Sequence, residues 1–165
     1  MKNHLLSTLS IILGLGAMVL FSSCEKMSYS RIRNLRAEAI DATTARIEFD
    51  VTLSEEDLRC NPTFTIYFSA QGDPKGLPES TPGLLRYTAV NSEGDHILKA
   101  GNNHMVSRAY NLPTSLEGYK GYIRVKEMKM VTLTEDDYDF ETYWSGLETV
   151  KVPKIGDPYI REGSV

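Results

Sequence analysis

The stretch Ala45-Arg46-Ile47-Glu48-Phe49-Asp50-Val51-Thr52-Leu53 alternates apolar and polar side chains over its whole length. Its odd-numbered positions carry only apolar side chains, and its even-numbered positions carry Arg, Glu, Asp and Thr. Successive side chains of a β-strand point to opposite faces of a sheet, so this alternation predicts a strand with one buried and one solvated face. Such faces are common in antiparallel sheets, which favours an antiparallel fold.

Apolar residues also recur at every second position in the segments before and after this stretch. Residues 31–39 precede it, and a parity slip near Asn34 predicts a β-bulge there. Residues 63–70 follow it as the next strand. Further strands are expected at residues 84–91 and 96–99, joined as a hairpin, and at residues 104–112, 119–130 and 144–152, the last with Leu147, Val150 and Val152 packed inward.

The connections between these strands carry turn signals. Ser54 and Asp57 have the spacing of a capping box, so one helical turn is the alternative to a plain connection there. Residues 71–83 hold three prolines and three glycines and are expected to form an irregular loop. With no helix-length amphipathic segment, the chain is predicted to be an all-β antiparallel sandwich of about seven to nine strands. It would span residues 31–153, followed by a flexible tail at residues 154–165.

Three segments resemble strands of the fibronectin type III family, an immunoglobulin-like sandwich. Residues 34–39 with 43–49 resemble its first two strands, residues 110–113 with 119–125 resemble its E and F strands, and residues 144–152 resemble its last strand. The resemblance implies two packed sheets. It also implies a tyrosine corner, with Tyr119 as the corner residue because it shares parity with Ile123 and Val125.

The N-terminus is typical of a secretory signal. Lys2 precedes an uncharged run from Leu5 to Phe21, and two serines then lead to Cys24. This end resembles a bacterial lipobox, although Phe21 stands where leucine is usual. The resemblance implies that residues 1–23 form an N-terminal signal helix, which is removed as a signal peptide. It also implies that Cys24 is then acylated. The alternative is an ordinary secretory signal that leaves Cys24 as a free thiol.

Acylation of Cys24 would determine how far the domain lies from the membrane and would leave Cys60 as the one other cysteine of the sequence. Residues 24–30 would form an acylated tether, whose extended length of about 20 Å keeps the domain near the bilayer. Glu25 follows the cysteine instead of aspartate, which by resemblance favours the outer membrane, with the periplasmic or surface-exposed face undetermined. Cys60 is then expected to be a free thiol with no disulfide within the chain.

Charge and motifs narrow the classes of function. The net charge of −4, without clusters of Lys and Arg, argues against a nucleic-acid partner, and Arg31, Arg33 and Arg36 are expected on the wet face of a strand. The sequence contains no phosphate-binding loop, CxxC, HExxH or nucleophile elbow, so neither an enzyme nor a cofactor is expected. A small hydrolase that uses His96 or His104 is the less favoured alternative.

Two overlapping sets of side chains near the C-terminus are candidates for binding. Asp136, Asp137 and Asp139 are weak candidates for a calcium site, with a solvated acidic loop as the favoured interpretation. Aromatic side chains can stack on sugar rings or anchor protein interfaces, and the candidates are Tyr138, Phe140, Tyr143 and Trp144. The alternative for Trp144 is that it fills one end of the sandwich.

These observations predict a non-catalytic binding or assembly module, anchored to the outer membrane, whose ligand is a glycan, a peptide or an envelope protein. The alternative is a structural subunit of an envelope complex. Both are compatible with a lipid anchor and with loops that lack catalytic groups.

Overall fold

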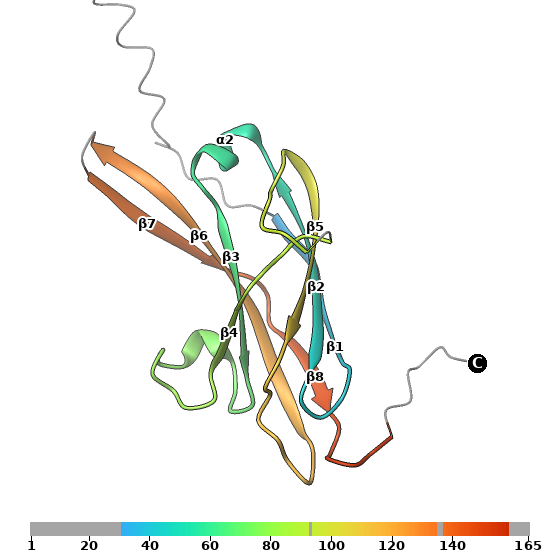
Figure 1. Ribbon diagram of the computed structural model, residues 1–165. Coiled ribbons are helices and arrows are strands. Elements are labelled where there is room, and N and C mark those ends of the chain that lie inside the picture. The colour runs from blue at the N-terminus through green and yellow to red at the C-terminus, as the bar shows by residue number, and fades with distance from the viewer. Residues whose placement is uncertain (1–30, 93, 135–136, 159–165) are drawn as a thin grey trace, which may run out of the picture.

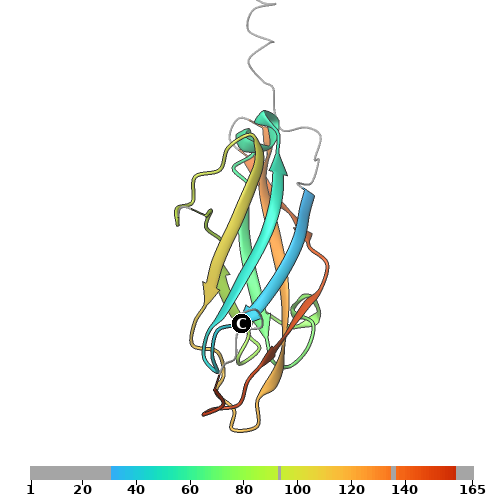
Figure 2. The ribbon, with the colours of Figure 1, turned by 90° about the vertical axis from the view of Figure 1, so that its right-hand side faces the viewer.

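Two antiparallel sheets pack face to face in the computed structural model, which describes residues 31–92, 94–134 and 137–158 (Figures 1 and 2). One sheet has the order β1-β2-β5, formed by Arg31–Ala39, Ala45–Leu53 and Gly101–Ala109. The other has the order β4-β3-β6-β7, formed by Leu85–Thr88, Thr63–Ser69, Tyr119–Thr134 and Asp137–Trp144, and β8 (Glu148–Val152) also pairs with β6. The predicted all-β sandwich is confirmed.

The strand order is that of an immunoglobulin-like fold. β1, β2 and β5 take the places of strands A, B and E, and β3 and β6 take those of C and F. β4 lies in the C′ position, and β7 and β8 share the place of the last strand. The predicted signal peptide, the tether with Cys24, and residues 159–165 of the tail lie outside the described residues. Within the described part, no helix has the length and hydropathy of a membrane span.

The buried core lies between the two sheets and follows the alternation of β2. The odd-numbered side chains of β2 are at most 2% exposed. They pack against side chains of β3 and β6 with the same inward parity, namely Phe64, Ile66, Phe68, Ile123 and Val125. Burial of these apolar groups is the main favourable contribution to folding.

The bulge predicted near Asn34 is present. The register between β1 and β2 shifts between Arg33 and Arg36, and Asn34 has a positive φ of 53°. Its amide Nδ2 donates to Asp50 Oδ2 at 2.8 Å, which holds the bulged residue against β2. Arg31, Arg33 and Arg36 are exposed on the outer face, as expected for the wet side of a strand.

The helical turn after β2 is also present, as α2 (Glu55–Arg59). Ser54 Oγ accepts from the backbone N–H of Asp57 at 3.0 Å, and Asp57 Oδ2 accepts from the N–H of Ser54 at 2.7 Å. These reciprocal bonds satisfy N–H groups that a helix start leaves without partners. The sequence-based alternative of one helical turn is therefore the correct one.

The predicted hairpin between residues 84–91 and 96–99 is wrong. β4 ends at Thr88, and the chain then crosses to the other sheet, where the N–H of Val106 donates to the carbonyl of Val90 at 2.9 Å. The side chain of Asn91 donates to the carbonyl of Ile97 at 3.1 Å, so the chain beyond it folds into a loop. Side-chain bonds of this kind compete with strand pairing.

The last predicted strand, residues 144–152, is interrupted. Ser145 is buried between β7 and β8, and its Oγ accepts from the N–H of Val125 at 2.9 Å, in place of a backbone acceptor. Leu147 is 43% exposed, so its predicted packing is wrong, whereas Val150 and Val152 are buried as predicted.

The tyrosine corner implied by the resemblance is not formed by Tyr119. Its hydroxyl is buried and has no hydrogen-bond partner among the described residues. The hydroxyl of Tyr87 instead donates to the carbonyl of Tyr110 at 2.5 Å and so ties β4 to the chain after β5. Burial raises the pKa of Tyr87 and of Tyr119 to about 12, so both rings stay neutral at physiological pH.

The long loop at residues 71–83 contains one 3₁₀ turn, Pro74–Gly76, and is otherwise irregular, as predicted. Arg124 of β6 holds it through two bonds, from Nε and Nη2 to the two oxygens of Asp73, both at 2.6 Å. The Arg124 guanidinium lowers the pKa of Asp73. The loop is thus fixed to the outer face of the sheet by a charged, two-point contact.

Candidate functional site

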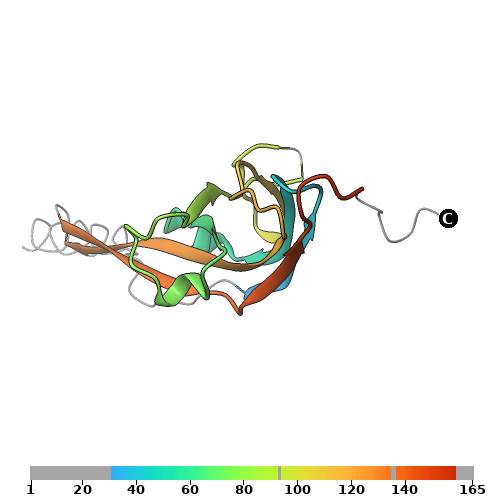
Figure 3. The ribbon, with the colours of Figure 1, turned by 90° about the horizontal axis from the view of Figure 1, so that it is seen from below.

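The hairpin of β6 and β7 extends beyond the sandwich (Figures 1 and 3). β6 pairs with β3 only as far as Met128, which lies opposite Thr63. Beyond that point β7 is the only described strand that pairs with β6, through pairs such as Met130 with Phe140, and the chain after α2 adds one bond, from the N–H of Met130 to the carbonyl of Cys60 at 2.9 Å. The segment predicted to be a solvated acidic loop is therefore mostly a two-stranded ribbon, and that prediction is wrong.

Alternation along β7 collects apolar side chains on one face of the ribbon. Tyr138, Phe140 and Trp144 share this face, and the register with β6 adds Met128 and Met130 to it. We call these five residues the outer stripe. They have the parity of Tyr67 on β3, opposite to that of the core residues, so the stripe faces away from the core.

Three of the five side chains of the outer stripe are open to solvent. Tyr138 is 60% exposed, Phe140 49% and Met128 36%. The rings of Tyr138 and Phe140 meet edge to face, with centroids 5.7 Å apart and planes at 80°. This is a favourable arrangement of two aromatic rings, so the pair presents a preformed apolar surface.

Trp144 lies at the inner end of the stripe and is partly buried. Its ring contacts that of Tyr67 at 4.9 Å between centroids, in an edge-to-face geometry. The ammonium of Lys126 lies 5.4 Å from the Trp144 ring and 5.9 Å from the Tyr67 ring, within cation–π range. Trp144 is therefore on the outer face of the sheet, and the alternative that it fills one end of the sandwich is wrong.

Tyr143 is separated from the other three candidate aromatics. It is 40% exposed and lies on the opposite face of β7, because neighbouring residues of a strand point to opposite sides. The sequence placed the four aromatics in one set, and the structure brings three of them together. Counting alternate side-chain directions back from Trp144 along a strand would have placed Tyr143 on the other face from Trp144, Phe140 and Tyr138.

The acidic residues follow the parity of Tyr143. Asp137 and Asp139 are exposed on β7, and Asp136 lies outside the described residues. Among the described residues, no three His, Cys, Asp or Glu side chains come together in an arrangement that could hold a metal ion. Among the described residues, Asp137 and Asp139 lie on the same face of the ribbon and give that face a negative charge.

The two histidines of the domain lie on different segments. His104, on the outer face of β5, has its Nδ1 2.7 Å from Asp50 Oδ1. His96 lies in the crossover after β4, with its Nδ1 3.3 Å from the carbonyl oxygen of Ala89. The structure thus places one beside a carboxylate and the other beside the backbone.

The expectation of a free thiol at Cys60 is wrong. Cys60 is buried, at 6% exposure, and is disulfide-bonded. The sequence contains one other cysteine, Cys24, which lies outside the described residues. A disulfide within one chain would use the same sulfur that the lipobox resemblance assigns to the lipid, so one molecule cannot carry both bonds.

Sequence reasoning missed Lys126 and the two methionines of the outer stripe. Met128 and Met130 alternate with Glu127 and Lys129, so polarity alone suggests that the methionines face the core. Val125 points into the core, so alternation along the same strand would have placed Met128 and Met130 on the outer face. No protein-family model matches the chain, and no curated protein matches its sequence.

Proposed function

We propose that this protein is a lipid-anchored, non-catalytic assembly module of the bacterial envelope, which binds another envelope protein through the outer stripe. The observation that carries the proposal is the exposure of Tyr138, Phe140 and Met128 on a ribbon that projects from the domain. Tyr, Phe, Trp and Met are enriched at the centres of protein interfaces. Contiguous exposed apolar surface commonly marks a site of association.

The composition of the stripe favours a protein over a glycan. A sugar needs polar groups that bond its hydroxyls beside the ring on which it stacks. The neighbours of Phe140 on its face are Met130, across the ribbon, Tyr138, which contacts it edge to face, and one small polar residue, Thr142. β7 is also the edge strand of its sheet, so its outer backbone groups can pair with a strand of a partner.

The position of β1 supports attachment beside a membrane-bound partner. Arg31, the first described residue, pairs with Thr52 near the end of β2, at the end of the sandwich that carries α2 and the ribbon (Figure 1). A short acylated tether would hold this end toward the bilayer. The stripe would then lie within reach of a protein in the same membrane.

Acylation of Cys24 is tested by the intact mass of the protein from its native host. We expect a mature chain that begins at Cys24 and exceeds its unmodified mass by the mass of the acyl groups. Cys60→Ser should keep the added mass. A mature chain without the added mass would contradict acylation of Cys24.

The role of the outer stripe is tested by replacing Tyr138 and Phe140 together with alanine. Both are exposed, so we expect an intact fold but a loss of about 2 kcal/mol or more in partner binding, roughly thirtyfold in affinity. The measurement is cross-linking in cells, followed by co-purification from detergent-solubilised outer membrane. Asp137→Ala with Asp139→Ala is the matched control, on the other face of the same strand. Equal recovery of partners with both double variants would contradict the proposal.

A further inference from the structure

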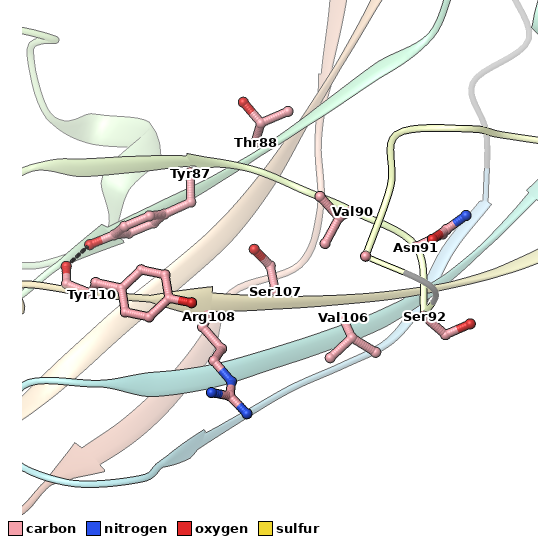
Figure 4. A pocket seen from close by; sticks show the side chains of 10 residues that line it. Tyr87, Thr88, Val90, Asn91, Ser92, Val106, Ser107, Arg108 and Tyr110 are labelled. Carbon is pink, nitrogen blue, oxygen red and sulfur yellow. Dashed lines mark hydrogen bonds between the residues drawn. The ribbon is translucent and has the colours of Figure 1, made fainter.

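A pocket of about 570 Å³ lies beside the edge strands β4 and β5, away from the outer stripe (Figure 4). Its polar side chains point in different directions, because the Ser107 hydroxyl and the Arg108 guanidinium lie on opposite sides of β5. The described residues that line the pocket therefore present no common set of groups to one molecule. Reactive groups that do converge lie in the core next to α2.

Three charged side chains meet there, at the base of the ribbon. The side chain of Lys129 is 2% exposed, and its Nζ lies 2.6 Å from Oδ1 of Asp57 and 3.2 Å from Oε1 of Glu127. Glu127 and Lys129 are alternate residues of β6, so both point to the same side of the sheet, and both are buried. An amine and two carboxyl groups are thus in direct contact.

Apolar side chains and burial shield this cluster from water. Glu127 is fully buried and lies opposite Phe64 of β3, whose ring packs against that of Phe49 with centroids 6.0 Å apart. The side chain of Asp57 is 13% exposed. Charged groups in such surroundings lose the hydration that stabilises them in water. A reaction that converts the ion pair into a neutral group removes this cost.

The carboxylate of Asp57 is held so that its two oxygens have different partners. Oδ1 accepts from Nζ of Lys129. Oδ2 accepts from the backbone N–H of Ser54 at 2.7 Å and from its hydroxyl at 2.8 Å. Two donors at these distances can stabilise a negative charge that develops on an oxygen during a reaction. Asp57 therefore presents its carbonyl carbon beside the lysine nitrogen, with one oxygen already bound by donors.

We propose that Lys129 and Asp57 condense into an isopeptide bond, an amide between the two side chains. The ion pair in this structure is the starting state. A bond forms between Nζ of Lys129 and Cγ of Asp57, and the bond between Cγ and Oδ1 breaks. Two of the three ammonium protons leave with Oδ1 as one water molecule. Nothing is oxidised or reduced, and no co-reactant is needed.

Glu127 is the group that moves the second proton. The first proton passes from Nζ to Oδ1 along the 2.6 Å hydrogen bond, which leaves a neutral amine and a neutral carboxyl group. The amine attacks Cγ, and the negative charge that forms on Oδ2 faces the two Ser54 donors. Glu127, 3.2 Å from Nζ, takes the second proton from the nitrogen and gives it to Oδ1, which leaves as water. Contact between the reacting groups replaces a bimolecular encounter.

The bond closes the 72 positions between residues 57 and 129 into a covalent loop, which joins α2 to the base of the ribbon. A pull on the ribbon by a bound partner then cannot extend this segment. That consequence rests on the proposed function, whereas the bond itself uses no residue of the outer stripe. Either proposal can therefore fail without the other.

The test is peptide mapping of the purified mature protein after reduction and digestion with trypsin. Trypsin does not cut after a lysine whose amine is part of an amide. We therefore expect a branched peptide in which residues 47–59 are joined to residues 127–151. Its mass should be the sum of the two peptides less one water molecule, and fragmentation should assign the link to Asp57 and Lys129.

Two results with the native protein would overturn the proposal. One is the recovery of residues 47–59 and 127–129 as separate peptides of full mass. The other is a loss of water within residues 127–151 alone, which would place the link on a carboxylate of that peptide, such as Glu141, which lies opposite Lys129 on β7. Both results can be read without any variant, so they do not depend on whether a variant folds.

Lys126 provides an internal control in the same digest. It also has a carboxylate partner, Glu79 at 3.8 Å, but the side chain of Glu79 is 65% exposed. An ion pair in contact with water should not condense, so we expect complete cleavage after Lys126. A second branched peptide that joins Lys126 to Glu79 would contradict burial as the cause.

The role of Glu127 is tested with Glu127→Gln, which keeps the size of the side chain but cannot accept the proton. Freshly purified Glu127→Gln should be mostly unlinked, since general acid–base catalysis contributes roughly 100-fold or more to a rate. Glu79→Gln is the matched control, the same change at an exposed ion pair, and should keep the branched peptide. Equal cross-linking of both variants would overturn the assignment of proton transfer to Glu127.

Discussion

Replacing Lys129 with methionine is expected to lower the free energy of unfolding by about 3–5 kcal/mol. The side chain of Lys129 is 2% exposed, and its ammonium lies 2.6 Å from Asp57 Oδ1 and 3.2 Å from Glu127 Oε1. Glu127 is itself fully buried. Methionine fills a similar volume but removes the positive charge, so the buried carboxylate of Glu127 and the partly buried carboxylate of Asp57 would lose the cation between them. The measurement is the midpoint of urea unfolding.

Two further variants separate this charge effect from a packing effect. Lys120→Met, at an exposed position of the same strand, should change stability by less than about 0.5 kcal/mol. Adding Glu127→Gln to Lys129→Met should recover part of the loss, because the variant then buries one charge fewer. A loss below about 1 kcal/mol for Lys129→Met would show that the buried network does not need its cation.

The same variant should unfold more readily in acid. Burial acts to raise the pKa of Asp57, but the hydrogen bonds from Lys129 and Ser54 outweigh it and lower the pKa overall. A carboxyl with a lowered folded pKa stabilises the fold above its ordinary pKa, and this contribution is lost as the pH falls through the lowered value. Without Lys129 the folded pKa rises, so stability should begin to fall at a higher pH than in the native protein.

The buried network explains where prediction from the sequence stops. The alternation of β2 predicts its two faces because one face is apolar throughout, and the spacing of Ser54 and Asp57 predicts α2 because a capping box is local. The burial of Lys129 depends on Asp57, which lies 72 positions away. No pattern in the sequence around Lys129 indicates that contact. A lysine in a strand is therefore predicted to be exposed.

The candidate site shows the same limit. The aromatic residues of the ribbon could be singled out as binding candidates from the sequence, although their segment was predicted to be a loop and not a strand. Their exposure could not be predicted, because it depends on β3 ending its pairing with β6 at Met128.

Gly121→Ala is expected to lower the free energy of unfolding by about 1–3 kcal/mol, because it overfills the core. Gly121 of β6 lies opposite Val150 of β8 and over the ring of Phe68. A Cβ at this position would lie 2.5 Å from Phe68 Cζ and 3.0 Å from Val150 Cγ1. The Phe68 ring is fully buried, so it cannot move away without disturbing its neighbours.

Gly146→Ala is the matched control, because nothing lies within 4 Å of a Cβ added there. It should leave stability unchanged or raise it slightly, since alanine restricts the unfolded chain more than glycine does. Combining Gly121→Ala with Phe68→Leu should cost less than the sum of the two changes, because the smaller side chain vacates the space that the methyl group needs. Strict additivity of the pair in urea unfolding would mean that the clash with Phe68 is not the cause.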